Sequence, residues 1–326
     1  MIDLGYQLAG RTLHRAARVI RRIGRMAGVA VPPNMVPSRD FYSISIYAGS
    51  SPFDLAPAGA EAVPVLTSRD VTDVAAAYVA DPFMIRVDGC WYMYFEILPK
   101  DIVKGVIGLA TSRDGLSWEY RQVVLEEPFH LSYPCVFESN GDYFMIPESN
   151  QAGAVRLYKA VHFPTRWSWM GNLIEHVEYV DCTPFRFHGK WWLLAGCGSP
   201  PMLAETLRLF RADRLTGPWT EHPASPVISN NSHIARPGGR VVVWCDRLYR
   251  FAQDCSPRYG LRIHAFEITE LTETCYRERA VTPDPVLAGS DHGWNSDGMH
   301  HIDPHPTEDG GCIACVDGWY WGGVDS

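Results

Sequence analysis

Short runs of alternating or aromatic-rich residues, bounded by Gly, Asp, Asn and Pro, dominate the chain from residue 40 onward. This pattern is typical of many antiparallel strands joined by tight turns. The stretch YVADPFMIRVDGCWYMYFE, residues 78–96, contains an apolar run, an Asp-Gly turn and an aromatic run. No long stretch of helical periodicity competes with the strand pattern in this part of the chain. We therefore expect an all-β fold.

The same hairpin pattern recurs about every fifty residues. It is marked by a proline near the start of each unit, at spacings of 52, 50 and 53 residues: Pro82, Pro134, Pro184 and Pro237. A second series marks a later turn, at spacings of 51 and 50 residues: Trp118, Trp169 and Trp219. A repeat of about fifty residues with four short strands is the length of a β-propeller blade.

A fifth blade can be assembled from the two ends of the repeat region. GMHHIDPHPTEDGGCIACVDGWYW, residues 298–321, reads as an inner hairpin, and FYSISIYAG, residues 41–49, reads as an outer strand. Pairing them would remove the open sheet edge that invites aggregation. We predict a five-bladed β-propeller over residues 37–326, with its ring closed by an N-terminal strand.

Residues 1–36 differ from the rest and are expected to form a basic amphipathic helix and a linker. Arginines recur at steps of four and three on one face of the predicted helix: Arg11, Arg15, Arg18, Arg22 and Arg25. The helix could pack its apolar stripe on the propeller. Alternatively, residues 8–27 could lie on an anionic membrane surface.

Composition narrows the expected partners and location. The chain has 326 residues, 46% of them hydrophobic, and a formal net charge of −8. That charge disfavours nucleic acid as a partner. Nine scattered cysteines and no apolar N-terminal stretch favour a cytoplasmic, or membrane-peripheral, location. Cys312 and Cys315 form a CxxC, but residues at this spacing face opposite sides of a strand, so we expect no metal or cofactor there.

Blade geometry brings separate polar residues to one rim. The start of the innermost strand and the end of the second strand lie at the same end of a blade. Four carboxylates at such positions are candidate catalytic groups: Asp81, Glu96, Glu148 and Asp181. Candidate substrate-binding residues are Tyr133, Arg236, Gln253, Asp254, His300, His301 and Trp91. Thr183 and Asp317 occupy further rim positions.

These residue types suit a carbohydrate ligand. Glycoside hydrolysis uses two carboxyl groups, one as acid and one as base or nucleophile. Aromatic side chains can stack on the apolar face of a sugar, although most strand aromatics pack between blades. Arg236 is interpreted as a clamp on a ligand or a carboxylate.

Several longer motifs carry a family resemblance. ADPFM, KGVIGLATSRDGLSW, EPFHLSYPCVFESNGDYFMIPES, VRLYKAVHFPTRW, RPGGR and LYRFAQDCSPRYG occur between residues 80 and 260. Together they resemble the N-terminal domain of plant glucosamine inositolphosphorylceramide transferases and its bacterial relatives. The resemblance runs from about Tyr42 to the last blade. The plant proteins also carry a separate glycosyltransferase domain, so the resemblance does not extend the transferase activity to this chain.

The chain is more distantly similar to five-bladed glycoside hydrolases of families 43, 32 and 130. That resemblance implies Asp81 as the general base. It implies Glu148 or Glu96 as the acid and Asp181 or Asp254 as the group that tunes the acid's pKa. Tyr133 stands where the family pattern has an aspartate.

Two functions therefore stay open. The first is glycosidase-like cleavage or transfer of a glycosidic bond on a carbohydrate or glycolipid, with Asp81 as the base and Glu148 as the acid. The alternative is a non-catalytic sugar-binding or scaffold propeller in cell-surface polysaccharide or glycolipid biosynthesis, with a glycosyltransferase as its partner. A third, weaker hypothesis is protein docking through the propeller rim.

Overall fold

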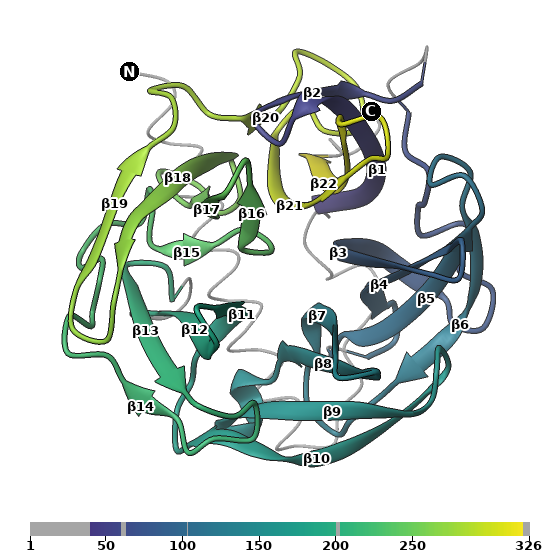
Figure 1. Ribbon diagram of the computed structural model, residues 1–326. Helices are drawn as coiled ribbons and strands as arrows, with labels where there is room; N and C mark the ends of the chain where they lie inside the picture. Colours follow the sequence, from purple (N-terminus) through teal and green to yellow (C-terminus); the bar gives the residue numbers. More distant parts are fainter. Residues whose placement is uncertain (1–39, 60–62, 103, 200–202, 322–326) are drawn as a thin grey trace. The chain divides into compact units, whose positions relative to one another are not determined.

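In the residues that the structure describes, twenty-two strands form five sheets around a common centre (Figure 1). A computed structural model of the chain describes residues 40–59, 63–102, 104–199 and 203–321. The strands confirm the expected all-β, five-bladed propeller. The predicted N-terminal helix lies outside the described residues. In the part of the chain that is described, no helix has the length and apolar character of a membrane span.

The first three blades follow the repeat in chain order. Blade 1 is β3 (Ala76–Val87), β4 (Cys90–Pro99), β5 (Val106–Ser112) and β6 (Glu119–Leu125). Blade 2 is β7 (Ser132–Ser139), β8 (Asp142–Glu148), β9 (Ala154–His162) and β10 (Arg166–Glu175), with a 3-10 turn at Asn150–Ala152. Blade 3 is β11 (Val180–Phe187), β12 (Lys190–Cys197), β13 (Thr206–Ala212) and β14 (Thr220–Glu221).

The last two blades are less regular. Blade 4 is β15 (Arg236–Pro237), β17 (Arg247–Asp254), β18 (Arg262–Leu271) and β19 (Tyr276–Ala280). The short strands β16 (Val242–Trp244) and β20 (Leu287–Ala288) pair with β17 and β18. The closing blade has the order β2 (Asp54–Pro57), β1 (Asp40–Ser51), β22 (Cys312–Trp321) and β21 (Gly298–Pro306). The N-terminal strand therefore closes the ring as expected, and it brings a second strand, β2, with it.

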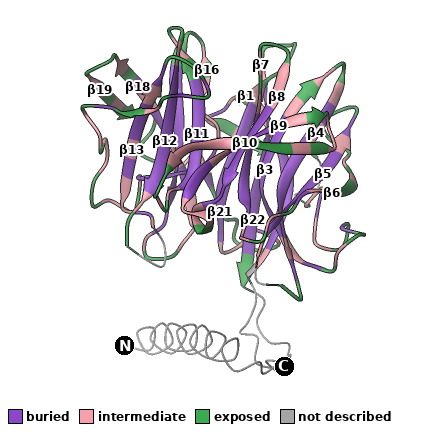
Figure 2. Cartoon of the chain, turned by 90° about the horizontal axis from the view of Figure 1, so that it is seen from below, coloured by how far each residue is buried: buried purple, intermediate pink, exposed green. Residues whose placement is uncertain are grey.

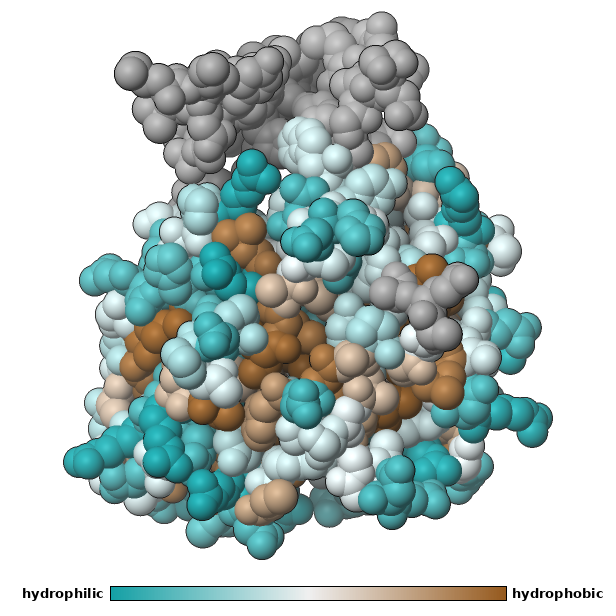
Figure 3. Space-filling model, turned by 90° about the horizontal axis from the view of Figure 1, so that it is seen from above, coloured by the Kyte–Doolittle hydropathy of each residue, from teal (hydrophilic) through white to brown (hydrophobic). Residues whose placement is uncertain are grey.

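Burial falls from the centre of the ring to its outside (Figure 2). The inner strand β7 is buried over most of its length, whereas the outer strand β10 is mostly exposed or half-buried. The hydrophobic cores lie between neighbouring blades, as where Phe83 and Tyr94 of blade 1 pack with Val136 and Met145 of blade 2. On the face shown in Figure 3, hydrophobic residues gather in the middle among hydrophilic ones. Inter-blade packing explains why most strand aromatics are core residues.

Four inner strands share a bulge at the same place. The register shifts between Ala80 and Phe83, and equivalent shifts occur in β7, β11 and β21. Within three of these bulges a non-glycine residue has a left-handed backbone: Asp81 (φ 54°), Tyr133 (φ 46°) and Asp181 (φ 49°). A bulge re-aims a side chain out of the strand alternation. Backbone strain of this kind concentrates at functional sites.

The tryptophan series needs one correction. The indole Nε1 of Trp118 donates to the Gly115 carbonyl, and that of Trp219 donates to the Leu215 carbonyl. In blade 2 the equivalent bond is made by Trp167, which donates to the Pro164 carbonyl. Trp169 is instead 50% exposed. The turn between β9 and β10 differs in length from the turns between β5 and β6 and between β13 and β14. A constant spacing along the chain therefore points to Trp169 and not to Trp167.

Candidate functional site

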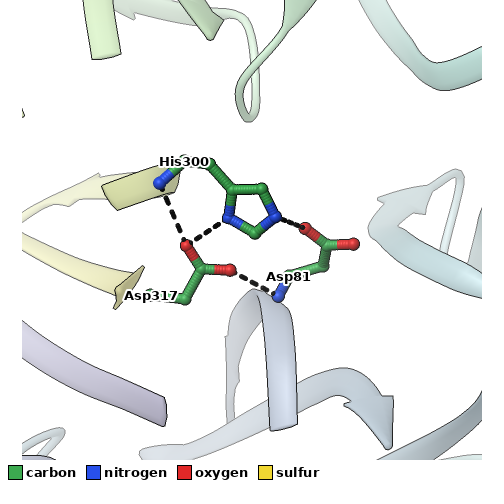
Figure 4. A group of neighbouring side chains, drawn as sticks. All are labelled: Asp81, His300 and Asp317. Atoms are coloured by element: carbon green, nitrogen blue, oxygen red, sulfur yellow. Dashed lines mark hydrogen bonds and ion pairs between the residues drawn. The ribbon is translucent and has the colours of Figure 1, made fainter. Parts of the chain in front are cut away.

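Asp81, His300 and Asp317 form the centre of the candidate site, called here the Asp81 cluster (Figure 4). The Asp317 Oδ1 atom lies 2.6 Å from the His300 Nδ1 atom. The other Asp317 oxygen accepts a 2.9 Å hydrogen bond from the backbone N–H of Asp81. His300 Nε2 is 3.6 Å from Asp81 Oδ1. The cluster joins blade 1 to the closing blade.

Burial and charge act together on these three groups. Burial raises the pKa of Asp81 to about 7, although His300 opposes the rise. Burial lowers the pKa of His300, but the charge and hydrogen bond of Asp317, together with the charges of Asp81 and Asp181, outweigh burial, and the pKa rises to about 9. Burial raises the pKa of Asp317, but the charge and hydrogen bond of His300, together with His301 and the Asp81 backbone N–H, outweigh burial, so the pKa is lowered. At neutral pH the cluster therefore holds an imidazolium, a carboxylate and a carboxyl group close to its titration point.

Adjacent residues of a strand normally face opposite sides, yet His300 and His301 both lie near Asp81. The Nδ1 atom of His301 is 3.9 Å from Asp81 Oδ1. The register shift between Gly298 and His301 breaks the alternation and allows this arrangement. Burial lowers the pKa of His301 to about 4, so its ring is neutral.

Arg236 organises a second group, the Arg236 cluster, with Asp181, Glu148 and Gln253. Its Nε donates to Asp181 Oδ2 at 2.6 Å, and an Nη reaches Glu148 Oε2 at 3.4 Å. The Gln253 amide also donates to Asp181 Oδ2, at 2.9 Å. Burial raises the pKa of Asp181 to about 7, and burial also raises the pKa of Glu148. The positive charge of Arg236 opposes both shifts. The structure thus places Asp181 beside Glu148, as a tuning residue would require.

Glu96 has a different environment from Glu148. It lies opposite Ala80 in the β3–β4 ladder, as Glu148 lies opposite Ser132 in blade 2. Its Oε1 accepts from the Tyr78 hydroxyl at 3.3 Å and is 3.6 Å from His130 Nε2. Burial raises the pKa of Glu96 well above its usual value, and the nearby Asp81 and Glu148 add to the rise.

Tyr133 contacts the side chain of Asp81 through its backbone. Its backbone N–H donates to Asp81 Oδ2 at 3.2 Å, and its hydroxyl is 2.8 Å from Thr183 Oγ1. The ring packs against Phe83 and His301 and is fully buried. It therefore fixes the position of Asp81, whereas the sequence suggested contact with a ligand.

Sequence reasoning missed four residues at the edge of the site. Tyr42 and Tyr259 rings contact the imidazole of His300. Tyr78 and His130 contact Glu96. Tyr78, His130 and Tyr259 are half-buried, whereas the carboxyl groups are buried, so these three side chains are the more exposed part of the site. His130 and Tyr259 belong to the motifs EPFHLSYP and CSPRYG, which could have drawn attention to these loops.

Two predicted residues are not brought to these clusters. Asp254 Oδ1 is 2.9 Å from His233 Nδ1, and its other oxygen is 3.2 Å from the Arg262 guanidinium. Trp91 packs against His305 and lies next to the β3–β4 turn, five residues before Glu96 on β4. It is at the far end of the hairpin because the aromatic run begins directly after the turn.

One ligand atom from each residue of the Asp81 cluster lies within 4.8 Å of the others. Asp317 is hydrogen-bonded to His300 Nδ1 and to the Asp81 backbone N–H. Cys312 and Cys315 are both free and buried, and Cys315 Sγ contacts the Pro82 carbonyl.

Solved structures place the fold in a definite class. The chain is similar to a β-1,2-mannobiose phosphorylase from Listeria innocua, with a TM-score of 0.60 and 14% identity over 83% of this chain and 96% of that one. It is also similar to an exo-β-1,3-galactanase from Clostridium thermocellum, with a TM-score of 0.55 and 11% identity over 66% of this chain and 51% of that one. The chain therefore shares its propeller fold with both of these proteins.

Within that class, the chain belongs to the family described as Glucosamine inositolphosphorylceramide transferase 1, N-terminal, which matches residues 37–319. It is 33% identical over 296 residues to Glucosamine inositolphosphorylceramide transferase 1 of Oryza sativa subsp. japonica. It is 34% identical over 297 residues to the Arabidopsis thaliana protein of the same name. Both alignments cover 85% of this chain, which spans about 40% of the length of these relatives.

Proposed function

We propose that the rim of this propeller binds a glycan and cleaves or transfers a glycosidic bond, with Asp81 as the general base. The observation that carries the proposal is the pairing of two buried carboxyl groups in contrasting environments. Asp81 faces the cation of His300, whereas Glu96 faces no cation that neutralises it, since burial lowers the pKa of His130 to about 4. One group is favoured as an ionised base and the other as a protonated acid.

Of the two glutamates, Glu96 has the environment of a proton donor. Glu148 contacts the Arg236 guanidinium, which favours its ionised form. Glu96 Oε1 accepts a hydrogen bond from the Tyr78 hydroxyl and lies 3.6 Å from His130 Nε2, and burial raises the pKa of Glu96 well above its usual value. We assign the acid role to Glu96. Glu148 then acts with Asp181 in binding, and its sequence-based assignment as the acid becomes the rival that the experiment tests.

The glycan class is supported by the fold and by the family. The solved structures with this fold include a phosphorylase of a mannobiose and a galactanase. The curated relatives are named for a transferase of glucosamine inositolphosphorylceramide. The half-buried Tyr78 and Tyr259 rings beside the carboxyl groups suit the apolar face and hydroxyls of a sugar.

The test is a turnover screen of the full chain against p-nitrophenyl α- and β-glycosides and a set of oligosaccharides and inositol-containing glycolipids. Asp81→Asn and Glu96→Gln should each lower kcat by about 10²–10⁴-fold, the usual contribution of a positioned acid or base. Glu148→Gln should raise KM with a smaller loss of kcat. Glu308→Gln is the control, because that side chain is 85% exposed and contacts Arg86 outside the site. Turnover that survives Asp81→Asn would overturn the proposal.

A second candidate function is non-catalytic glycan binding beside a glycosyltransferase. It is favoured by the low exposure of the carboxyl groups, since Asp81, Glu96, Glu148 and Asp181 are only 1–6% exposed. It is also favoured by the length of the relatives, of which this chain spans about 40%. Saturable binding of a glycan without turnover, unchanged in the Asp81→Asn and Glu96→Gln variants, would select this function.

A further inference from the structure

We propose that His300 and Asp317 are positioning residues for Asp81: Asp317 holds both the imidazole and the Asp81 backbone, and the imidazole keeps a positive charge against the Asp81 carboxylate. This inference rests on the proposed role of Asp81 as the base. It adds two residues to the reaction that do not touch the substrate.

Asp317 is the anchor of the arrangement. One of its oxygens lies 2.6 Å from His300 Nδ1 and also accepts from the His300 backbone N–H at 3.3 Å. The other accepts from the backbone N–H of Asp81 at 2.9 Å. Asp317 is 0% exposed, so no water competes for these bonds. Charge-assisted bonds of this kind are among the strongest in proteins.

The Asp81 backbone needs such an anchor. Its φ of 54° lies in the left-handed region, which is costly for a residue with a Cβ. The Asp81 backbone N–H donates to the buried Asp317 carboxylate, and the Asp81 side chain accepts from the Tyr133 backbone N–H. These two hydrogen bonds hold both the backbone and the side chain of Asp81. The carboxylate is therefore held in one orientation within the bulge.

The orientation of His300 follows from the same contact. Because Nδ1 bonds to Asp317, Nε2 is the atom that faces Asp81 Oδ1, at 3.6 Å. This distance is too long for a hydrogen bond, so the imidazole acts on Asp81 through its charge. The rings of Tyr42 and Tyr259 pack on the imidazole and limit its access to water. The Asp317–His300 pair thus delivers a fixed positive charge to one side of the base.

The other charged groups around Asp81 shift its pKa in opposite directions. Asp181 and Asp317 raise the pKa of Asp81, whereas His300 and Arg236 lower it. His301 lies 3.9 Å from Asp81 Oδ1 but is neutral, because burial lowers its pKa to about 4. Burial also raises the pKa of Glu96 well above its usual value, which favours the uncharged form of that carboxyl group. Of these groups, His300 is cationic and its Nε2 lies 3.6 Å from Asp81 Oδ1. Loss of its charge should therefore leave Asp81 harder to ionise.

The direct test is an NMR titration of the full chain with isotope-labelled histidine and aspartate. In the wild type the His300 imidazole should lose its proton near pH 9. Asp317→Asn should move that transition down by at least about one pH unit, because the nearest opposite charge is gone. His300→Gln should move the Asp81 transition up by about one pH unit or more. An unchanged Asp81 transition in His300→Gln would overturn the inference.

His305→Gln is the matched control. His305 lies on the same strand, β21, and also contacts a buried aspartate, with Nε2 3.0 Å from Asp303 Oδ2. His305 contacts Asp303 and Trp91, whereas the histidines beside Asp81 are His300 and His301, so both titrations should stay at their wild-type positions. If Asp317→Asn does not fold, His300→Gln still tests the inference. That variant keeps the hydrogen bond from the Asp81 backbone N–H to Asp317.

A second readout separates this inference from the proposed function. If a substrate is found, the acid limb of the pH–rate profile should shift upward in His300→Gln, with a greater loss of rate at pH 6 than at pH 9. A merely structural role would lower the rate equally at both. If no substrate is turned over, the proposed function fails, and the NMR titration still decides whether His300 and Asp317 control Asp81.

Discussion

At Glu96, burial and two neighbouring charges act in the same direction on one carboxyl group. Burial raises its pKa first, and Asp81 and Glu148 raise it further. His130 cannot offset them, because its pKa is lowered to about 4 and its Nδ1 accepts the Gly105 N–H. The rim position of Glu96 follows from strand alternation and turn placement, which are local. The protonation state depends on contacts with other blades, which local sequence does not contain.

Glu96→Gln should make the protein more stable above neutral pH. A carboxyl whose pKa is raised on folding supports the fold fully below its unfolded pKa, and this support is lost as pH rises through the folded value. At pH 8 the unfolded chain ionises Glu96 and the folded chain resists it, so a neutral amide removes a penalty on the order of 1 kcal/mol or more.

Thermal unfolding of both proteins at pH 4.5 and pH 8 checks this expectation. The variant should have the higher Tm at pH 8, with a smaller difference at pH 4.5. A lower Tm for Glu96→Gln at pH 8 would mean that Glu96 is ionised in the folded protein, and the acid role would then return to Glu148.

At the scale of the elements, glycine makes one strand contact possible. Gly238 and Gly239 belong to the RPGG motif between β15 and β16, and the Ile302 N–H donates to the Gly238 carbonyl at 2.9 Å. A Cβ on Gly239 would lie 1.7 Å from the Ile302 carbonyl oxygen, and the residue has φ 144°. The motif therefore lets blade 4 approach the inner strand of the closing blade.

Gly239→Ala should destabilise the propeller by about 3 kcal/mol, because the backbone of β21 cannot move aside cheaply. Gly189→Ala is the control, since Gly189 has φ 79° but nothing lies within 4 Å of its Cβ position. That substitution carries only the backbone strain, about 1–2 kcal/mol. Urea unfolding measures both, and equal losses would show that the close approach to Ile302 is unimportant.

The tryptophan correction gives a second test at this scale. Trp167 is half-buried and donates to the Pro164 carbonyl, whereas Trp169 is 50% exposed. Trp167→Ala should cost about 2 kcal/mol of unfolding free energy, and Trp169→Ala less than about 1 kcal/mol. The same urea series measures both. A larger loss at Trp169 would restore the assignment made from spacing.

At the scale of the molecule, a buried ionic contact joins the blades where the ring closes. Asp303 of β21 accepts from Arg240 Nε at 2.6 Å and from the Met84 backbone N–H at 2.7 Å. Burial raises the pKa of Asp303, but the charges and hydrogen bonds of Arg240 and His305 together outweigh burial, and the pKa falls well below its usual range. The contact therefore links blade 1, the chain after β15 and the closing blade.

Asp303→Asn should cost about 3–5 kcal/mol, because it leaves a largely buried guanidinium without its counter-charge. The Arg86–Glu308 pair also links blade 1 to the closing blade, but its side chains are 46% and 85% exposed. Glu308→Gln should therefore cost less than about 1 kcal/mol. Thermal or urea unfolding measures the loss of stability in both variants. Similar small losses would contradict the role of Asp303 in ring closure.

The sequence by itself determined the number of blades, the strand that closes the ring and the rim positions of Asp81, Glu96, Glu148 and Asp181. These follow from spacing and alternation, which are read along the chain. Only the tertiary structure decided the partners: Asp317 binds Asp81 across 236 residues, and Arg236 reaches Asp181 across 55. It also decided the bulges that turn His300 and His301 toward Asp81, and the half-buried Tyr78 and Tyr259 at the site. Such contacts depend on how blades pack around a centre, and no local pattern records that packing.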